Sequence, residues 1–188
     1  MLSFIQYQKI ARLLHSGGVI AYPTEGVFGL GCAPDNAEAV MHILNIKDRK
    51  MSAGLILISP NLELLAPWIA PTSTELQKLH TELPKAVTWI VTARADTPDW
   101  LTGGRDTLAV RISNHHVMSG ICLAAGMPLV STSANRSGHP PALTTLAARK
   151  WFGNAVDAVV PGTLCNAAGA SEIRVAQTDQ LLRPQSNN

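Results

Sequence analysis

The sequence has 188 residues, close to the usual length of one domain, so we expect a single domain over residues 1–188. Its 46% hydrophobic and 15% charged content argues against a disordered chain and favours a compact α/β protein with a large core. The formal net charge of +2 leaves room for a local basic patch but does not require a nucleic-acid partner.

The three cysteines, Cys32, Cys122 and Cys165, are widely spaced and form no CxxC pair. This pattern argues against a disulfide framework and a zinc site, and it fits a reducing compartment. The histidines also form no ligand pattern, so we expect no protein-bound metal site. No signal peptide is visible at the N-terminus, and no stretch approaches 18 uninterrupted apolar residues. We therefore expect a cytoplasmic protein that does not contact a membrane.

Helical and strand patterns alternate along the chain. Apolar residues recur at helical spacing over residues 4–14, where Ser3 can cap a helix and Gly17 and Gly18 can end it. The alternation predicts an α/β fold whose sheet is covered on both faces. Further helices are expected over residues 38–47, from residue 60, over 73–83, from Asn114 to near Gly126, and over 144–152. Strands are expected over residues 19–22, 55–59, 87–92, 108–112, 129–132 and 156–160, with weaker candidates at 173–175 and 181–183.

Two segments in the first half of the chain have the composition of binding loops. Residues 22–31, YPTEGVFGLG, follow a buried strand, and their glycines allow either the close approach of a ligand or simply a turn of the chain. Their spacing fits neither a Walker loop nor a dinucleotide-binding loop. Lys47 and Arg49 end a predicted helix, where they can complement the helix dipole or clamp a phosphate.

In the second half, two strands end in polar residues. Residues 128–138, PLVSTSANRSG, run from a strand into hydroxyl and amide groups, which suit phosphate or carboxylate oxygens better than a simple capping turn. Residues 107–111, TLAVR, place Arg111 at a strand end, where it should pair with a buried acid or a ligand anion. Residues 171–174 (SEIR) and 182–184 (LRP) add further hydroxyl and guanidinium groups.

In this order, these segments resemble the YrdC-like family of threonylcarbamoyl-adenylate synthases over about residues 17–184. The matching motifs are YPTE and FGLG, Lys-x-Arg, GLIL, LAVR, STSAN with SG, and SEIR. The resemblance implies a single YrdC-like α/β domain with a twisted, mostly mixed sheet flanked by helices. It also implies a nucleotidyltransferase that makes threonylcarbamoyl-adenylate and pyrophosphate from L-threonine, bicarbonate and ATP. Partner proteins would then transfer the threonylcarbamoyl group to tRNA.

The same resemblance implies a set of site residues. In the implied reaction, threonine and bicarbonate give N-carboxythreonine, whose anionic carbamate oxygen attacks the α-phosphorus of ATP, so no protein nucleophile or general base is needed for this step. The site must instead align the reactants and neutralise phosphate charge, usually with Mg²⁺. Residues expected to bind ATP are Lys47, Arg49, Thr107, Ser133, Asn135 and Arg183, and those expected to bind threonine are Thr24, Arg111, Ser131 and Ser171.

Three positions depart from the family pattern. Gly26 stands where longer members often have Thr, Ile58 stands where they have His, and Lys85 stands in the place of the glycine of Pro-Gly-Pro. These changes concern how threonine is held more than whether ATP binds.

Two other functions remain open from the sequence. An RNA-binding or ribosome-maturation factor is compatible with the basic clusters at 47–50 and 149–150, which could contact tRNA or double-stranded RNA, although few aromatic residues accompany them. An enzyme that uses carbamoyl phosphate is the second alternative, and it would act without threonine.

Overall fold

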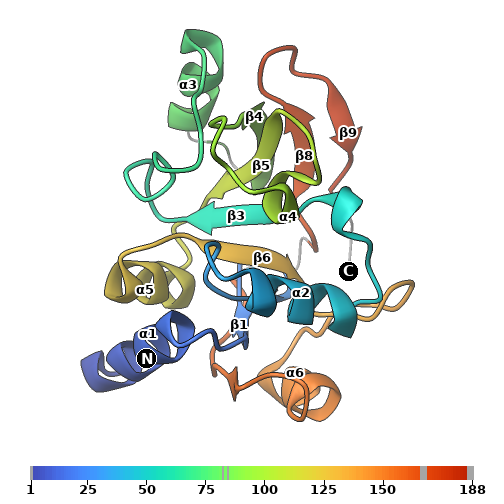
Figure 1. Cartoon of the computed structure of the whole chain (residues 1–188). Helices are drawn as coiled ribbons and strands as arrows, with labels where there is room; N and C mark the ends of the chain where they lie inside the picture. The colour runs from blue at the N-terminus through green and yellow to red at the C-terminus, as the bar shows by residue number, and fades with distance from the viewer. Residues whose placement is uncertain (1, 82, 84, 166–168, 186–188) are drawn as a thin grey trace.

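The computed structural model describes residues 2–81, 83, 85–165 and 169–185. Within these ranges the strands form one sheet in the order β7-β1-β2-β6-β3-β5-β4-β8-β9 (Figure 1). The pairs β1/β7, β3/β5 and β4/β8 are parallel and the other neighbours are antiparallel, which confirms the expected mixed sheet. The strands are β1 Ile20–Pro23, β2 Phe28–Gly31, β3 Ile56–Ser59, β4 Val87–Thr92, β5 Thr107–Ile112, β6 Leu129–Ser133, β7 Ala158–Val159, β8 Glu172–Val175 and β9 Leu181–Arg183.

The helices α1, α2, α3 and α6 begin at side chains that cap free backbone N–H groups. Ser3 and Gln6 form a capping box at α1, and Thr72 and Glu75 form another at α3. The helices are α1 Phe4–His15, α2 Ala37–Ile46, α3 Ser73–His80, α4 Asp99–Thr102, α5 His116–Ala125 and α6 Thr145–Phe152, with a short 3₁₀ turn, η1, at Met51–Ala53. No helix in the described part of the chain is long and apolar enough to cross a membrane.

The structure differs from the expected elements at three places. The second half of the glycine-rich segment is itself a strand, β2, because Phe28 and Leu30 alternate with glycines and are fully buried. The helix expected from residue 60 is a series of turns, since Pro67 has no N–H to continue a helix. Finally, α5 is preceded by His115 rather than Asn114 at the capping position.

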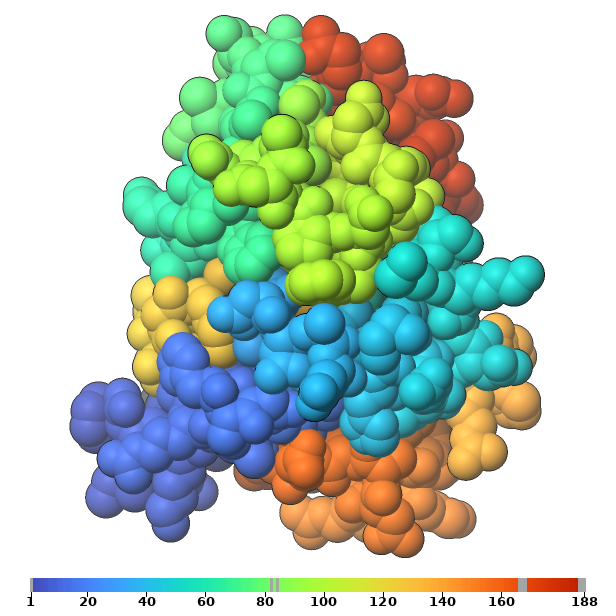
Figure 2. Space-filling model, in the orientation of Figure 1, coloured from blue at the N-terminus to red at the C-terminus, as the bar shows by residue number. Residues whose placement is uncertain are grey.

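Each face of the sheet has its own core. Leu57 and Val130 point to one face, where a large cluster includes residues of α2, α3, α4 and α6. Ile58 and Leu129 point to the other, where they pack against α1 and α5. In Figure 2 the α2 and α4 segments, blue and yellow-green, cover the middle of the visible face. The helices therefore flank both faces, as the sequence predicted.

Candidate active site

A cavity of about 540 Å³ lies on the sheet face that α1 and α5 cover only in part. This volume is within the range of small-molecule sites. Arg105, Thr102 and the backbone around Gly54 also line it. Eight of the ten side chains expected at the site line this cavity, and they are Thr24, Arg49, Thr107, Arg111, Ser131, Ser133, Ser171 and Arg183.

The strand register brings these residues together. Ile56 of β3 pairs with Ser131 of β6 on one side and with Ala109 of β5 on the other. Residues two apart on a strand point to the same face, so Ser133 joins Ser131, and Arg111 joins Ala109. Three strands that are distant in sequence, β3, β5 and β6, thus contribute to one wall of the cavity at neighbouring positions of the sheet.

Three arginines at the cavity are anchored to the protein through backbone carbonyl groups. Arg49 Nη2 donates to the Gly54 carbonyl at 3.0 Å, Arg105 Nη1 to that of Ser52 at 2.9 Å, and Arg183 Nη2 to that of Ser171 at 2.8 Å. Burial and then the Arg105 charge lower the pKa of Arg49, while burial, Arg49 and Arg111 lower the pKa of Arg183. The lowered pKa values reflect burial first and, after it, the other cations nearby.

Arg111 has a different environment, because it pairs with a carboxylate. Its Nη2 lies 3.2 Å from Glu25 Oε2, and both side chains are largely buried. Burial raises the pKa of Glu25, but the Arg111 guanidinium and the Ser113 hydroxyl lower it by more, so the net pKa is below its usual value. The Arg111 Nε is buried without a hydrogen-bond partner among the described residues, which is uncommon for a buried donor.

Lys47 and Asn135 are the two expected site residues that do not line the cavity. The Lys47 ammonium is buried and donates to the Ser133 carbonyl at 2.6 Å and to the Asn135 carbonyl at 2.9 Å. It also donates to Asn135 Oδ1 at 2.8 Å, and the Ser133 hydroxyl donates to the same oxygen at 2.6 Å. Burial and then Arg49 lower the pKa of Lys47 to about 8. In this arrangement Lys47 holds the loop that follows β6, and a contact of Lys47 or Asn135 with ATP stays a prediction.

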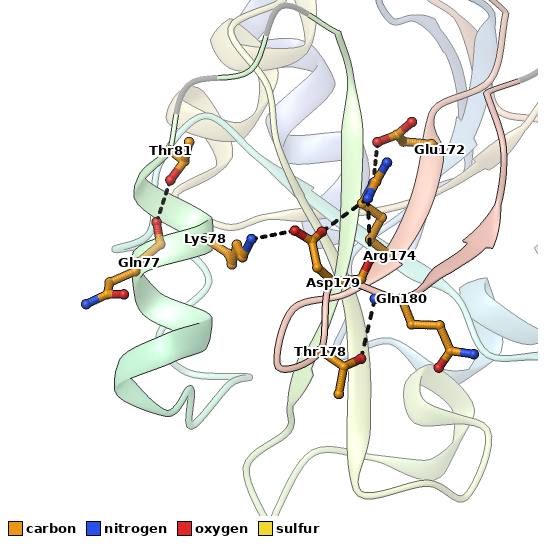
Figure 3. A network of polar contacts seen from close by, with 8 residues as sticks. All are labelled: Gln77, Lys78, Thr81, Glu172, Arg174, Thr178, Asp179 and Gln180. Carbon is orange, nitrogen blue, oxygen red and sulfur yellow. Dashed lines mark hydrogen bonds and ion pairs between the residues drawn. The ribbon is translucent and has the colours of Figure 1, made fainter.

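The β8–β9 hairpin carries Ser171 and Arg183 and is fixed by two sets of contacts. At the cavity, the Thr88 and Ser171 hydroxyls share a hydrogen bond of 2.8 Å. Farther out, Arg174 joins Glu172 at 2.6 Å and Asp179 at 3.2 Å, and Asp179 meets Lys78 of α3 at 2.7 Å (Figure 3). This network ties the edge hairpin to α3.

The structure gives reasons for the three departures from the family pattern. A side chain at Gly26 would overlap the carbonyl oxygen of Gly169, so close approach of the backbone requires glycine there. Ile58 is fully buried in the core beside α5, outside the cavity. Lys85 pairs at 2.8 Å with Glu172, a carboxylate whose side chain is only 5% exposed, and so supports the start of β8.

Sequence reasoning missed two residues at this site, Arg105 and Glu25. Arg105 lies in a Gly-Gly turn, where an arginine is ordinarily solvated, and Glu25 lacked an identified partner until the fold placed Arg111 beside it. No group of three or more His, Cys, Asp or Glu residues in the described ranges could hold a metal ion.

The chain matches known proteins over almost its whole length. The family model described as "Telomere recombination", for Sua5, YciO and YrdC proteins, matches residues 12–184. The chain belongs to the Sua5/YciO/YrdC family. It is 48% identical over 174 residues to the threonylcarbamoyl-AMP synthase of Nitrosococcus oceani, covering 92% of this chain and 94% of the relative. It is also 48% identical over 174 residues to the Escherichia coli protein of that name, covering 91% of each.

A solved structure has the same fold. Sua5 from P. abyssi, determined in complex with L-threonine, superposes with a TM-score of 0.90 at 24% sequence identity. The match covers 98% of this chain and 55% of that one, so this chain spans about half of the longer Sua5 protein.

Proposed function

We propose that the protein is a threonylcarbamoyl-AMP synthase that forms its product and pyrophosphate from L-threonine, bicarbonate and ATP. One observation carries the proposal: a single cavity joins a group of arginines that have no carboxylate partner among the described residues to a separate Arg111–Glu25 pair surrounded by hydroxyls. The unpaired arginines suit a polyanion, and the Arg111–Glu25 pair with its hydroxyls suits an amino acid. The threonylcarbamoyl-AMP synthases that are 48% identical over nearly their full length support the same function.

On this proposal the two substrates occupy adjoining parts of the cavity. Arg111 would bind the threonine carboxylate through its guanidinium. Thr24, Ser131 and Ser171 would be available to the nitrogen and the hydroxyl of threonine. The residues proposed to contact the ATP phosphates directly are Arg49, Arg183, Thr107 and Ser133. Lys47 and Asn135 would support ATP binding by holding the backbone of the Ser133 loop.

The chemistry needs alignment and charge neutralisation more than proton transfer. An oxygen of N-carboxythreonine attacks the α-phosphorus, forming a carbamate–phosphorus bond, and the bond to the bridging oxygen of pyrophosphate breaks. The attacking oxygen is anionic, and the electron pair leaves with pyrophosphate, so fixed cations stabilise the transition state. Mg²⁺ would be held largely by the phosphates, because the described residues contain no carboxylate cluster for it.

The product fits a place in tRNA modification, where cytoplasmic partner proteins would consume the activated threonylcarbamoyl group. An RNA-binding role without catalysis is the competing function. The four polar residues proposed for the threonine end favour the enzyme, because a site that only binds the RNA backbone needs cations and no amino-acid pocket.

The proposal is tested by measuring pyrophosphate release by the purified protein with ATP, bicarbonate and one amino acid at a time. Release should require both threonine and bicarbonate, and the adduct should be detected by mass spectrometry. Equal release with serine, alanine or no amino acid would contradict the substrate assignment. Activity with carbamoyl phosphate in the absence of threonine would favour the other enzyme class.

A further inference from the structure

We propose that Arg105 forms, with Arg49 and Arg183, the site that holds the β- and γ-phosphates of ATP and then the pyrophosphate product. The inference rests on the proposed function and assigns a residue that lies outside every motif shared with the family. Arg105 follows Gly103 and Gly104 in the turn between α4 and β5, and it lines the cavity.

The first support is geometric. Arg105 and Arg49 both donate to carbonyl groups of the same short segment, that of Ser52 at 2.9 Å and that of Gly54 at 3.0 Å. A Cβ at Gly54 would clash with Nη2 of Arg105, so this guanidinium packs directly on the glycine backbone. The η1 turn therefore holds two guanidinium groups at one rim of the cavity. Each planar guanidinium has further N–H donors that can still bind an anion.

The second support is the balance of charge. Within residues 2–81, 83, 85–165 and 169–185, neither Arg49, Arg105 nor Arg183 forms an ion pair with a carboxylate. The acids nearest in sequence to Arg49 and Arg105, Asp48 and Asp106, are exposed, and the acid nearest to Arg183, Asp179, pairs with Lys78 and Arg174. Like charges brought together in this way repel one another, and a multivalent anion between them would remove that repulsion.

The third support is the difference in net charge between this site and the threonine end. Arg111 already has the Glu25 carboxylate at 3.2 Å, so that pair carries little net charge and suits a ligand with a single carboxylate. The three uncompensated arginines suit a ligand with several charges. As the bond from the α-phosphorus to the bridging oxygen breaks, negative charge grows on pyrophosphate, which Arg105 is placed to neutralise.

The test measures binding of inorganic pyrophosphate, L-threonine and AMP to the free protein by calorimetry. Arg105→Gln removes the charge but keeps a donor for the Ser52 carbonyl, and Arg94→Gln is the matched control, since Arg94 pairs with exposed Asp96 and does not line the cavity. Loss of one charge-assisted contact should weaken pyrophosphate binding about 10- to 100-fold. Threonine affinity should stay unchanged, AMP affinity should fall by less, and Arg94→Gln should bind all three ligands like the wild type.

Two results would overturn the inference. One is equal pyrophosphate affinity in wild type and Arg105→Gln, and the other is a parallel loss of threonine affinity, which would indicate a general disturbance of the cavity. Arg105→Lys provides a second check, because it keeps the charge and should retain part of the affinity. Binding of pyrophosphate requires neither threonine nor bicarbonate. A selective loss of pyrophosphate binding in Arg105→Gln therefore supports the phosphate site even if the protein does not synthesise threonylcarbamoyl-AMP. Normal synthesis together with unchanged pyrophosphate binding would contradict this inference and leave the proposed function standing.

Discussion

The Lys47 ammonium lies 2.8 Å from Asn135 Oδ1 and 2.9 Å from the Asn135 carbonyl oxygen, so these two residues, 88 positions apart, bind each other. Ser133 Oγ donates to the same Oδ1 at 2.6 Å and lines the cavity. The Lys-x-Arg segment is therefore divided, with Arg49 at the cavity and Lys47 behind the loop. Two polar motifs that look independent in the sequence form one structural unit.

Replacing Lys47 and Arg49 should separate stability from binding. From the sequence, both residues are expected to be exposed cations at the end of a helix. In the structure Arg49 is exposed, but Lys47 is only 5% exposed. Lys47→Met removes one hydrogen-bond donor from each of three oxygens and should lower the free energy of unfolding by about 1–3 kcal/mol as well as the rate. Arg49→Ala should lower the rate about 30- to 1,000-fold with little change in stability. Urea unfolding and pyrophosphate release on both variants provide the check, and equal stabilities would contradict the burial argument.

The lowered pKa of Lys47 predicts opposite effects of pH on activity and on stability. Deprotonation at about pH 8 removes the charge that holds the Ser133 loop, so kcat/KM for ATP should fall as pH rises through this value. The unfolded lysine keeps its proton up to its ordinary pKa of 10.5, so the unfolded state binds more protons between the two values. This group therefore makes the free energy of unfolding rise with pH over that window. Both trends should be absent in Lys47→Met, and identical pH profiles in the two proteins would refute the prediction.

A double replacement in the loop should distinguish the enzyme from an RNA-binding protein. Ser133→Ala with Asn135→Ala removes the contacts that shape the loop without changing net charge, so adenylate formation should be lost while tRNA affinity and its salt dependence stay constant. Reversal of charge at Arg149 and Lys150 on α6, outside the cavity, should do the opposite if those residues contact RNA. Paired assays of pyrophosphate release and tRNA binding measure both effects. Full synthesis by the loop variant would show that the site is misplaced.

Glu25 is expected to position Arg111 for threonine. Glu25→Gln removes the charge 3.2 Å from the guanidinium, so Arg111 should lose its fixed orientation and KM for threonine should rise about tenfold or more, with a smaller change for ATP. Glu63→Gln, at an exposed position outside the cavity, is the matched control. Steady-state kinetics with each substrate varied in turn supply the measurement. Equal rises in both KM values would indicate a structural role only.

Local periodicity determined the elements of this fold. The alternation of helical and strand patterns predicted the α/β class with helices on both faces of the sheet, because the spacing of apolar residues shows which side of a helix or strand is buried. That the sheet is mixed was implied only by the family resemblance. It failed at β2, where alternating glycines conceal a buried strand, and after residue 60, where Pro67 prevents a helix. The strand β2 is recognisable only from the neighbours that bury it, which are distant in the chain. The missing helix depends on a single backbone N–H that Pro67 lacks.

The residue types of the site were also visible in the sequence, and eight of the ten expected side chains line one cavity. Their roles were not, since burial and pairing arise only when strands meet. Lys47 is buried because β6 brings Asn135 onto it, Glu25 gains a partner because β5 places Arg111 there, and Arg105 joins Arg49 because η1 offers both a carbonyl group. The sequence by itself determined which chemical groups this protein possesses. Only the tertiary structure decided which of them face a ligand and which hold one another, because hydrogen bonds and charge interactions depend on distances that no local pattern encodes.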